Sequence, residues 1–515
     1  MKKLGVGLYG HNGQGEDMKA FSRDGIPEPV YASRPDWVEL YWEAWRLAAE
    51  HVVEREGAPQ SPYMDEGFDP NTVWIWDTCF MAAFCKYAPE RFPGVESFEN
   101  FYAPLHEGRS SSLVIQHPDN PPLFAWLELE HVRFTGSLDR LRNVWKRGVL
   151  QKHDAFFQDQ PLPRTITHPA ARYHNDLHWN GTGYLWSGVA SGMDNTPRGR
   201  GTDPHGIDGH ERILWFDALA QQALSARCLA EIADLLHDPE ADHWRRVHAE
   251  RVARLNQVHW CAEEGMYYDV LSEMPTEFVR VKTPAVYWPL LAGACGPEQT
   301  AALARQTEDP DVFGGAAPWP SVSRDDPDYD STGGYWRGGV WLPLAYMATK
   351  ALERNGYKTL ADRHARTLLD HMCRTLREVE PHTIWEAYAP ETPRPATGKD
   401  GVGRVRPDFC GWSALGPISL FIENVLGFRE INGLTRTVVW DCPDTPGPLG
   451  IRKLRFGDVH ADLLWEDGKL RCTGNVPFTL IFRGEPNADF IRNRRESRLR
   501  GNPANGLAVP RMEEE

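Results

Sequence analysis

The chain has 515 residues and a formal net charge of −16, with 41% hydrophobic and 25% charged residues. This composition is typical of a folded protein with a sizeable core, and the length allows one large domain with a smaller one, or two to four ordinary domains. The acidic balance disfavours nucleic acid or an anionic membrane as the main partner, and no apolar segment approaches the roughly 18 residues of a membrane span.

The N-terminus and the cysteines favour a cytoplasmic protein. Lys2 and Lys3 are not followed by an apolar segment, so no signal peptide is expected in the chain as given. The nine cysteines are scattered and form no CxxC pair. Such a set is typical of reduced thiols and disfavours a disulfide framework or a zinc knuckle.

Helical patterns dominate most of the chain. Residues 1–35 are rich in glycine and proline and predict an irregular arm. Apolar residues then recur at helical spacing, first in a predicted helix over 37–54. Further helices are expected to begin near Trp76, Pro122, Leu138, Glu211, Pro239, Pro284, Gln299, Tyr335, Thr359 and Trp412. Helical hairpins curled into a closed α/α toroid would account for this pattern, whereas an α-solenoid would need a repeat of fixed length, and none is found.

Strand patterns replace helical ones after Phe428. Alternating apolar residues at 435–440, 459–465, 469–472 and 478–482 predict short strands between turns. We therefore expect a mainly α protein with a helical domain over 36–428 and a small β-domain over 429–495. Residues 496–515 are polar and lack periodicity, which predicts a flexible tail.

The chain contains 20 Trp, nearly as many as its 21 Phe. Indole offers a flat apolar face and one N–H donor, so a tryptophan-lined cleft suits sugars, although a tryptophan-rich core would explain the count equally well. Trp37, Trp42 and Trp45 lie on a helical stripe, but most of the tryptophans named below fall in acidic or glycine-rich loops. Their location favours a sugar-binding cleft.

Six short segments combine acidic, aromatic and glycine residues beside predicted helices. They span residues 73–80, 117–126, 184–198, 333–343, 383–392 and 408–415. In a functional interpretation, Asp77 accepts sugar hydroxyls, Glu386 orients a water, and Arg337 holds a carboxylate. In a structural interpretation, Asp77 caps a helix, Asp194 closes an Asx turn, and Arg337 forms an ordinary ion pair.

The chemistry that fits these segments best is glycoside hydrolysis, which needs two carboxyl groups on opposite sides of the scissile bond. No catalytic Ser–His pattern, phosphate loop or HExxH motif accompanies them. His174 and His178 have the spacing of a metal pair on a helix, but the Asn and Asp between them favour a turn. We therefore expect a carbohydrate substrate, no metal and no other cofactor.

In the same order, these segments resemble the inverting α-glycosidases of glycoside hydrolase families 63 and 37. That group includes processing α-glucosidase I, bacterial mannosylglycerate and glucosylglycerate hydrolases, and trehalases. The matching residues are 74–78, 120–122, 191–195, 335–338, 385–392 and 411–414. The resemblance implies an (α/α)6 toroid with the active site in the cleft at one end.

The resemblance also implies roles for particular residues. Asp194 corresponds to the general acid, which protonates the leaving oxygen, and Glu386 to the general base, which activates a water on the other face of the sugar. Such a pair is expected to lie about 6.5–9.5 Å apart. Residues expected to line the sugar pocket are Trp74, Trp76, Asp77, Asn120, Trp186, Trp336, Arg337 and Trp412.

Two departures from the family pattern leave the substrate open. Asn120 stands where many relatives have Gln, and the loop over 198–206 is unlike theirs. Arg198 and Arg200 in that loop would suit an anionic or polyol leaving group, but a solvated loop is an equal interpretation. We expect hydrolysis of a small α-glucoside or related oligosaccharide. The alternatives are another toroid enzyme, a lyase or an epimerase, and a non-catalytic sugar-binding toroid, both of which the intact Asp194 and Glu386 disfavour.

Overall fold

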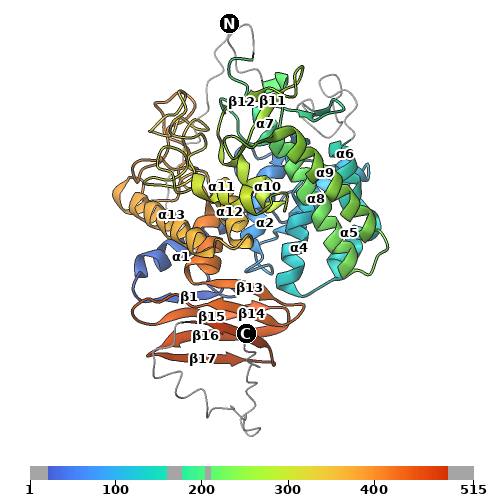
Figure 1. Cartoon of the computed structure of the whole chain (residues 1–515). Coiled ribbons are helices and arrows are strands. Elements are labelled where there is room, and N and C mark those ends of the chain that lie inside the picture. The colour runs from blue at the N-terminus through green and yellow to red at the C-terminus, as the bar shows by residue number, and fades with distance from the viewer. Residues whose placement is uncertain (1–20, 159–176, 203–209, 485–515) are drawn as a thin grey trace.

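The computed structural model describes residues 21–158, 177–202 and 210–484, which form a helical body with strands gathered at one end (Figure 1). The predicted tail, the first 20 residues of the predicted arm, and His174 lie outside the described residues. The helices are α1 (Pro35–Glu50), α2 (Ile75–Cys85), α3 (Glu99–His106), α4 (Phe124–Thr135), α5 (Asp139–Arg147), α6 (Val149–Gln158), α7 (Gly188–Ser191), α8 (Phe216–Leu235), α9 (Ala241–His259), α10 (Tyr287–Leu291), α11 (Pro297–Gln306), α12 (Leu342–Arg354), α13 (Lys358–Glu378) and the π-helix η6 (Gly416–Val425).

The first helix illustrates how the sequence determines these elements. Pro35 occupies the first turn of α1, where its missing N–H costs no hydrogen bond. Trp37, Leu40, Ala44 and Trp45 then recur at helical spacing and are all buried. The predicted stripe is thus confirmed as a core face at Trp37 and Trp45, whereas Trp42 is only partly buried and the helix ends at Glu50 instead of 54.

Helix contacts run around a closed path. α2 contacts α4, α4 contacts α8, α8 contacts α10, and α10 contacts α12. η6 contacts both α12 and α2, so the path returns to its start, as expected for a toroid. α9 packs on α8 and α13 packs on α12 and η6. The described chain is therefore helix-rich with a toroid-like order of contacts.

Several predicted helix starts are displaced. A helix expected near Tyr335 begins at Leu342, where a proline follows in the first turn, and the one expected near Glu211 begins at Phe216. Near Trp412 the chain forms a short 3-10 helix, η5 (Ser413–Leu415), before η6. The aromatic residues of these segments therefore lie in loops that precede helix N-termini, although they continue the apolar pattern.

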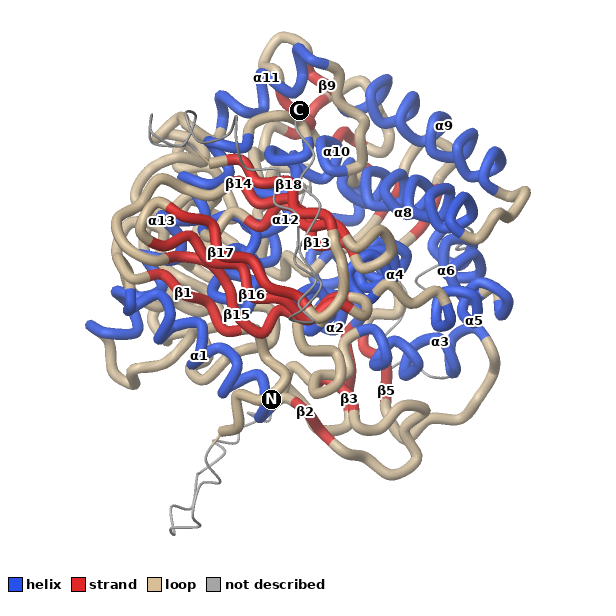
Figure 2. The backbone as a smooth tube through the Cα atoms, turned by 90° about the horizontal axis from the view of Figure 1, so that it is seen from below, coloured by secondary structure: helices blue, strands red, loops and turns tan. Residues whose placement is uncertain are grey.

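The C-terminal strands form two sheets, which Figure 2 shows from below the helical body. One consists of β13 (Phe428–Asn432), β14 (Thr437–Asp441) and β18 (Thr479–Arg483); the other consists of β1 (Glu28–Tyr31), β15 (Leu449–Phe456), β16 (Val459–Glu466) and β17 (Lys469–Gly474). β1 pairs antiparallel with β15, with Tyr31 opposite Leu449. The prediction of an irregular arm is thus wrong for residues 28–31, because the exposed edge of β15 provides a partner that local sequence does not reveal.

Short strands also form within the loops of the helical body, where they pair in small sheets of two or three strands. They are β2 (Val52–Val53), β3 (Tyr63–Met64), β4 (Thr72–Trp74), β5 (Val114–Gln116), β6 (His178–Trp179), β7 (Tyr184–Leu185), β8 (Ile213–Leu214), β9 (Trp260–Cys261), β10 (Met266–Tyr267), β11 (Asp269–Leu271) and β12 (Phe278–Val279). Short 3-10 helices are η1 (Val95–Phe98), η3 (His210–Arg212) and η4 (Pro284–Val286).

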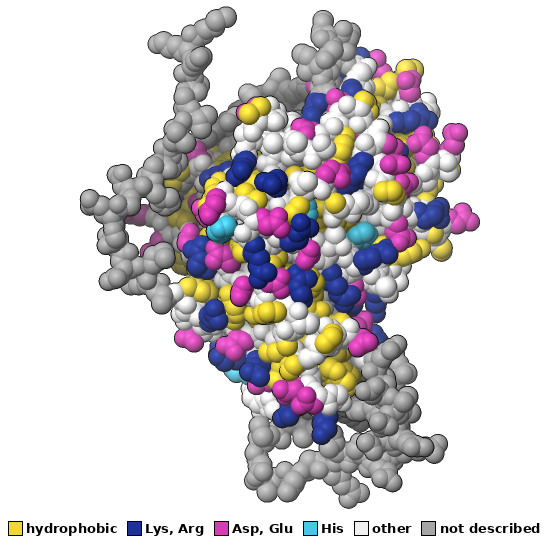
Figure 3. Space-filling view, turned by 90° about the vertical axis from the view of Figure 1, so that its left-hand side faces the viewer, with side chains coloured by type: hydrophobic (Ala, Val, Ile, Leu, Met, Phe, Trp, Pro, Cys, Tyr) yellow, Lys and Arg dark blue, Asp and Glu magenta, His cyan; other side chains and the backbone are white. Residues whose placement is uncertain are grey.

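The distribution of charged side chains on the surface agrees with the acidic balance of the sequence. Acidic and basic side chains are interspersed over the face in Figure 3, without a continuous basic area. Within the described residues, no helix has both the length and the apolar character needed to cross a membrane.

Candidate active site

A cavity of about 210 Å³ lies where five of the six predicted segments meet. Its lining residues are Phe68, Trp74, Trp76, Asp77, Gln116, His117, Asn120, Val189, Gly192, Asp194, Tyr335, Trp336, Trp341 and Trp412. Most belong to segments that precede or begin α2, α4, α12 and η5. α7, which precedes Asp194, lies at the end of the helical body away from the two C-terminal sheets (Figure 1).

Stacked aromatic rings form much of the cavity wall. Trp336 stacks on Trp341 with ring centroids 4.0 Å apart and planes at 5°, and Trp412 packs obliquely on Trp341 at 5.8 Å. Phe68 meets Trp74 edge to face at 5.7 Å. The wall therefore offers rigid apolar faces between polar groups, as binding sites for small ligands generally do.

Asp77 adds a buried carboxyl to this wall. It lies in the first turn of α2, whose N-cap position is Trp74, so the structure does not bear out the interpretation of Asp77 as the cap. Burial raises the pKa of Asp77 well above its usual range, and the nearby charges of Asp194 and Glu386 raise it further. A carboxyl that holds its proton in this way can donate as well as accept a hydrogen bond.

Glu66 is a further buried carboxyl near Asp77. Burial raises the pKa of Glu66 well above its usual range, with smaller contributions from Asp65 and Asp77. A carboxyl with a raised pKa favours its protonated form.

Among the described residues, no cluster of three or more His, Cys, Asp or Glu side chains is arranged to hold a metal ion.

Asp194 is placed by a tight turn after α7. The Ser187 hydroxyl caps this helix by accepting a hydrogen bond from Ala190 N–H, and Gly192 ends it with φ +83°. The next residue, Asn195, connects the turn to the loop before α12 through two hydrogen bonds. Its Nδ2 donates to the Gly334 carbonyl at 3.0 Å, and its Oδ1 accepts from Trp336 N–H at 2.8 Å. The turn holds the Asp194 backbone at the cavity and leaves its side chain 25% exposed.

The close approach of Gly192 to Trp76 yields a stability prediction. A Cβ at position 192 would lie 2.8 Å from the Trp76 ring, and its φ of +83° disfavours any L side chain. Gly192→Ala is therefore expected to lower the free energy of unfolding by about 2–4 kcal/mol, measured by urea denaturation. Gly108→Ala is the control, because Gly108 has φ +66° but nothing within 4 Å of its Cβ, and it should cost only about 1 kcal/mol. Equal losses in both variants would contradict the proposed contact.

Glu386 lies next to the cavity and is 2% exposed. Its Oε1 accepts a hydrogen bond from the Tyr335 hydroxyl at 3.2 Å, and its Oε2 accepts one from Arg406 N–H at 3.1 Å. The Glu386 carbonyl accepts from Trp412 Nε1 at 3.0 Å, which fixes the backbone. Burial raises the pKa of Glu386, whereas the bonds from Arg406 and Tyr335 lower it.

Tyr335 is hydrogen-bonded to Glu386 and lies near enough to Asp194 to feel its charge. Its backbone has φ +63°, an uncommon conformation for a non-glycine residue, and its N–H donates to the Thr397 carbonyl at 2.8 Å. Burial, together with Glu386 and Asp194, raises the pKa of the Tyr335 hydroxyl well above its usual range, so this hydroxyl remains a donor. On the other side, the Asp194 carboxylate forms an ion pair with Lys399, with Nζ 2.8 Å from Oδ2.

The structure brings together most of the predicted site residues: Trp74, Trp76, Asp77, Asn120, Asp194, Trp336 and Trp412 all line the cavity, and Glu386 is bonded to a residue that does. Asn120 already uses its amide for the scaffold, because its Nδ2 donates to the Ala190 carbonyl at 2.6 Å and its Oδ1 accepts from Trp76 N–H at 3.5 Å. Within this arrangement, Asn120 positions both walls of the cavity.

Two predicted pocket residues do not line the cavity. Trp186 is 1% exposed, packs against Phe157 and Trp215, and donates its Nε1–H to the Asp119 carbonyl at 3.1 Å. Arg337 pairs with Asp328 at 3.2 Å and donates to the Asn195 carbonyl. Trp186 is therefore a core residue, and Arg337 forms the structural ion pair that was the alternative interpretation.

The arginines of the unusual loop are also structural. Arg198 is fully buried, binds Asp217 and Asp269 with both edges of its guanidinium, and lies against the Trp215 ring at 4.1 Å. Arg200 pairs with Asp326 at 2.6 Å and also with Asp328. The interpretation of Arg198 as a ligand for an anionic leaving group is wrong, because both edges of its fork are already occupied by carboxylates.

Sequence reasoning missed Phe68, Gln116, Lys399 and Arg406. Gln116 lies opposite Trp74 in the pairing of β5 with β4, and the Arg406 guanidinium covers the Phe68 ring at 4.4 Å. Gln116, Lys399 and Arg406 lie outside the six segments singled out from the sequence. Phe68 stands beside Glu66, Gly67 and Asp69, a combination of acidic, glycine and aromatic residues that could have identified it. Tyr335 and Trp341 did carry a signal, since both lie in the glycine-flanked segment 333–343.

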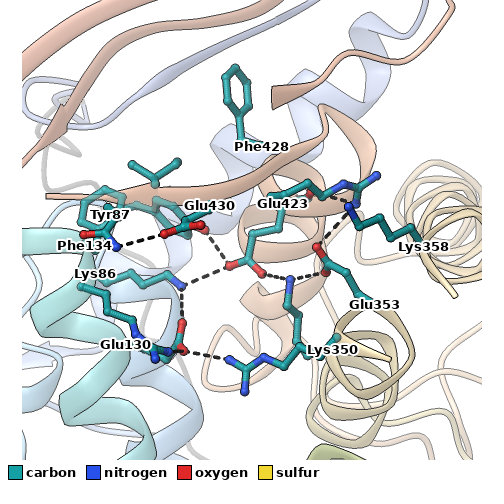
Figure 4. A pocket seen from close by; sticks show the side chains of 15 residues that line it. Lys86, Tyr87, Glu130, Phe134, Lys350, Glu353, Lys358, Glu423, Phe428 and Glu430 are labelled. Atoms are coloured by element: carbon teal, nitrogen blue, oxygen red, sulfur yellow. Dashed lines mark hydrogen bonds and ion pairs between the residues drawn. The ribbon is translucent and has the colours of Figure 1, made fainter. Parts of the chain in front are cut away.

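A larger cavity, of about 480 Å³, lies between the helical body and β13 (Figure 4). Glu423 lies at its centre, 3.2 Å from Lys86 and 2.8 Å from Lys350, and accepts a hydrogen bond from Tyr87 at 2.6 Å. Burial alone would raise the pKa of Glu423, but the charges of the two lysines lower it to about 2. The lining of this cavity has six basic and four acidic side chains, several of them joined in ion pairs. The smaller, aromatic cavity contains the residues that the sequence singled out and is the candidate active site.

Sequence similarity relates the chain to known proteins. Residues 118–400 match the family model described as mannosylglycerate hydrolase MGH1-like glycoside hydrolase domain. An uncharacterized protein of Borreliella burgdorferi is 22% identical over 461 residues, which cover 85% of this chain and 90% of that protein. The mannosylglycerate hydrolase of Thermus thermophilus is 32% identical over 171 residues, covering 31% of this chain and 38% of the relative.

Solved structures are similar over a larger part of the chain. The GH63 mannosylglycerate hydrolase of Thermus thermophilus, in complex with glucose, aligns with a TM-score of 0.54 at 20% identity. The alignment covers 74% of this chain and 99% of that one. Neutral trehalase Nth1 of Saccharomyces cerevisiae aligns with a TM-score of 0.51 at 15% identity, over 70% of this chain and 73% of the trehalase. At these identities, the likeness shows a shared fold.

Proposed function

Because this chain belongs to the mannosylglycerate hydrolase MGH1-like glycoside hydrolase family, it is a glycoside hydrolase, and we propose that it cleaves a small α-linked glycoside with inversion at the anomeric carbon. The sugar we propose is glucose or mannose, the two sugars in the names of its relatives. We further propose that Asp194 is the general acid and Glu386 the general base. The fold that we infer for this activity is the six-hairpin (α/α)6 toroid, followed by a C-terminal β-domain.

The observation that carries this proposal is that two differently placed carboxylates belong to one aromatic site: one lines the cavity, and the other is bonded to Tyr335, which lines it. Asp194 lines the cavity and is 25% exposed, whereas Glu386 is buried and held by Tyr335 and Arg406. The charge of Asp194 contributes to the raised pKa of Glu386, so the two groups act on each other across the site. Two carboxyl groups with separate environments can take separate roles, one donating and one accepting a proton.

In the proposed reaction, Asp194 enters as a carboxylic acid and gives its proton to the glycosidic oxygen as the bond from that oxygen to the anomeric carbon breaks. Glu386 enters as a carboxylate and takes a proton from water, whose oxygen forms the new bond to the anomeric carbon. One water is consumed, and the products are the free sugar, with a new hydroxyl on its anomeric carbon, and the alcohol of the leaving group. Solvent then returns the proton from Glu386 to Asp194.

The surroundings of Glu386 suit a base. The two hydrogen bonds from Tyr335 and Arg406 stabilise the carboxylate, and they partly offset the burial that favours the acid. They also fix the orientation of both carboxylate oxygens. Because its pKa is raised, the carboxylate of Glu386 has a stronger driving force for taking a proton from water than an ordinary surface carboxylate.

Removal of one of these bonds yields a pH prediction. Because the Tyr335 hydroxyl lowers the pKa of Glu386, Tyr335→Phe is expected to raise it, and the base then stays protonated up to a higher pH. The acid-side limb of the pH profile of kcat/KM should therefore move to higher pH, as measured over pH 4–9. Tyr346→Phe is the matched control, since its hydroxyl approaches the carboxylate of Glu423 at 3.4 Å, in the other cavity. An unshifted acid limb in Tyr335→Phe would contradict the assigned base.

The experiment that tests the proposed function is a hydrolysis screen. The purified chain is offered α- and β-linked glucosides and mannosides of small alcohols and hydroxy acids, and released sugar is measured. We expect turnover of α-linked members only. Turnover confined to β-linked members, or to none of the panel, would overturn the proposal.

A further inference from the structure

A third cavity, of about 360 Å³, lies between α1 and α13, which pack against each other (Figure 1). The described residues that line it are all different from those that line the aromatic cavity. One of them, Glu391, belongs to the same predicted segment as Glu386, so this cavity adjoins that segment. Its volume is within the range of sites that bind small molecules.

One face of α13 forms much of the lining. Its members recur at helical spacing and are Arg366, Thr367, Asp370, His371 and Arg374. Arg34 and Trp37, from the start of α1, line the other side. The cavity therefore offers several hydrogen-bonding groups that two packed helices hold in place.

His371 leaves a buried hydrogen-bond acceptor in this cavity without a partner. The residue is 6% exposed, and burial lowers its pKa to about 4, so the ring is neutral near pH 7. A hydrogen bond to the backbone of Ala389 favours the protonated ring, so the ring is the donor in that bond. The other nitrogen, Nε2, is therefore an acceptor, and it has no partner among the described residues.

Trp37 adds a buried donor without a partner. It is 4% exposed, and its Nε1–H donates to no acceptor in the part of the chain that the structure describes. The Arg34 guanidinium lies over the indole ring at 4.0 Å and helps to fix its position. Buried polar groups are generally hydrogen-bonded. Hydroxyl groups can serve both Trp37 and His371, because a hydroxyl donates and accepts.

One positive charge in the cavity is also available. Asp370 pairs with Arg34 at 2.7 Å, and Glu391 pairs with Arg324 at 2.7 Å. Arg366 is partly buried and forms no ion pair or hydrogen bond with any described residue. Because both acidic side chains of the lining are engaged, the Arg366 guanidinium can bind an anionic oxygen group through two parallel hydrogen bonds.

We propose that this cavity is a binding site, separate from the active site, for a small anion that carries hydroxyl groups: a sugar or polyol with a phosphate or carboxylate group. The anionic group binds Arg366, and the hydroxyls accept a hydrogen bond from Trp37 Nε1 and donate one to His371 Nε2. A simple anion would satisfy the charge alone, and water would satisfy the two buried atoms alone. The inference does not depend on the proposed function, because no step of the proposed reaction uses these residues.

Isothermal titration calorimetry on the full chain tests this site with two pairs of probes. Glucose 6-phosphate is compared with inorganic phosphate, and gluconate with acetate, so that each pair differs in the hydroxylated part. We expect the hydroxylated member of at least one pair to bind about tenfold or more tightly than its simple anion. The pair that shows this preference identifies the anionic group as a phosphate or a carboxylate.

Substitutions locate the bound anion. Arg366→Gln should weaken binding of the preferred anion about ten- to hundredfold, because a charge-assisted hydrogen bond is lost. Trp37→Phe keeps an aromatic ring but removes the N–H, and it should weaken binding about two- to tenfold. Arg363→Gln is the matched control: this arginine lies on the same helix, pairs with Glu308 and does not line the cavity, so wild-type affinity is expected. Urea denaturation shows that each variant is folded.

Three results would overturn the inference. Wild type could bind neither hydroxylated anion at millimolar concentration, or it could bind both simple anions as tightly as their hydroxylated partners. Wild-type affinity in Arg366→Gln would place the anion elsewhere on the protein. These measurements involve no hydrolysis, so their failure is distinct from a failure of the proposed function.

Discussion

Glu386→Gln is expected to reduce kcat about 10²- to 10⁴-fold on every substrate, because the amide cannot take a proton from the attacking water. The amide has nearly the shape of the carboxylate and can still accept a hydrogen bond from Tyr335, so the variant should fold normally. The loss should not depend on the leaving group, since water activation is needed whichever group departs. Steady-state kinetics on α-glycosides with poor and good leaving groups measure this.

The matched control is Glu380→Gln, which removes an exposed carboxylate that bonds to His382. It should keep wild-type turnover. Added azide provides a positive test, because this small anion can attack the anomeric carbon without a base and should restore product formation in Glu386→Gln as a glycosyl azide. Near-normal turnover of Glu386→Gln would remove Glu386 from the role of base.

Asp194→Asn is expected to show a loss that depends strongly on the leaving group. Asparagine cannot protonate the glycosidic oxygen, so kcat on alkyl glycosides should fall about 10²- to 10⁴-fold. Glycosyl fluorides need little help from an acid, and their hydrolysis should fall far less. Comparing alkyl glycosides with glycosyl fluorides thus distinguishes the acid from the base. A general disturbance of the site would instead slow both classes of substrate alike.

The control for this variant is Asp242→Asn. This substitution removes an exposed carboxylate on α9, which pairs with Arg245 and does not line the cavity. Wild-type rates are expected there on both classes of substrate. If Asp194→Asn lost alkyl glycosides and fluorides to the same extent, its carboxylate would be acting in some other way than as the acid.

The order of motifs made much of the cavity predictable from sequence. The predicted resemblance is confirmed by the family match over residues 118–400. Trp74, Trp76, Trp336 and Trp412 were placed in a cleft because they stand beside glycine or acidic residues at the ends of apolar helices, and all four line the cavity. Loops before helix N-termini converge at one end of a ring of helices, which is why the segments meet.

The same reasoning failed where partners come from far along the chain. Trp186 stands in a glycine-rich acidic segment like the cleft tryptophans, but Phe157 and Trp215 enclose it. Arg198 appeared free to bind a ligand, because its two carboxylate partners, Asp217 and Asp269, lie 19 and 71 residues away. Local pattern indicates what a residue can do, but burial and pairing decide what it does.

Lys399 shows the opposite failure. Its position in a glycine-rich turn predicts only a solvated charge, and nothing in the sequence relates it to Asp194, which lies 205 residues earlier. The contact exists because Thr397 fastens the turn to the backbone of Tyr335. Such loop-to-loop bonds depend on the assembled helices and are not visible in local sequence.

The configuration of the first-formed sugar tests the central claim most directly. Hydrolysis of an α-glycoside is followed by proton NMR from the first seconds, before the two anomers of the free sugar equilibrate. If Glu386 activates a water opposite the leaving group protonated by Asp194, the β-anomer appears first and the α-anomer only later. Initial release of the α-anomer would contradict the inverting mechanism assigned to these two carboxylates.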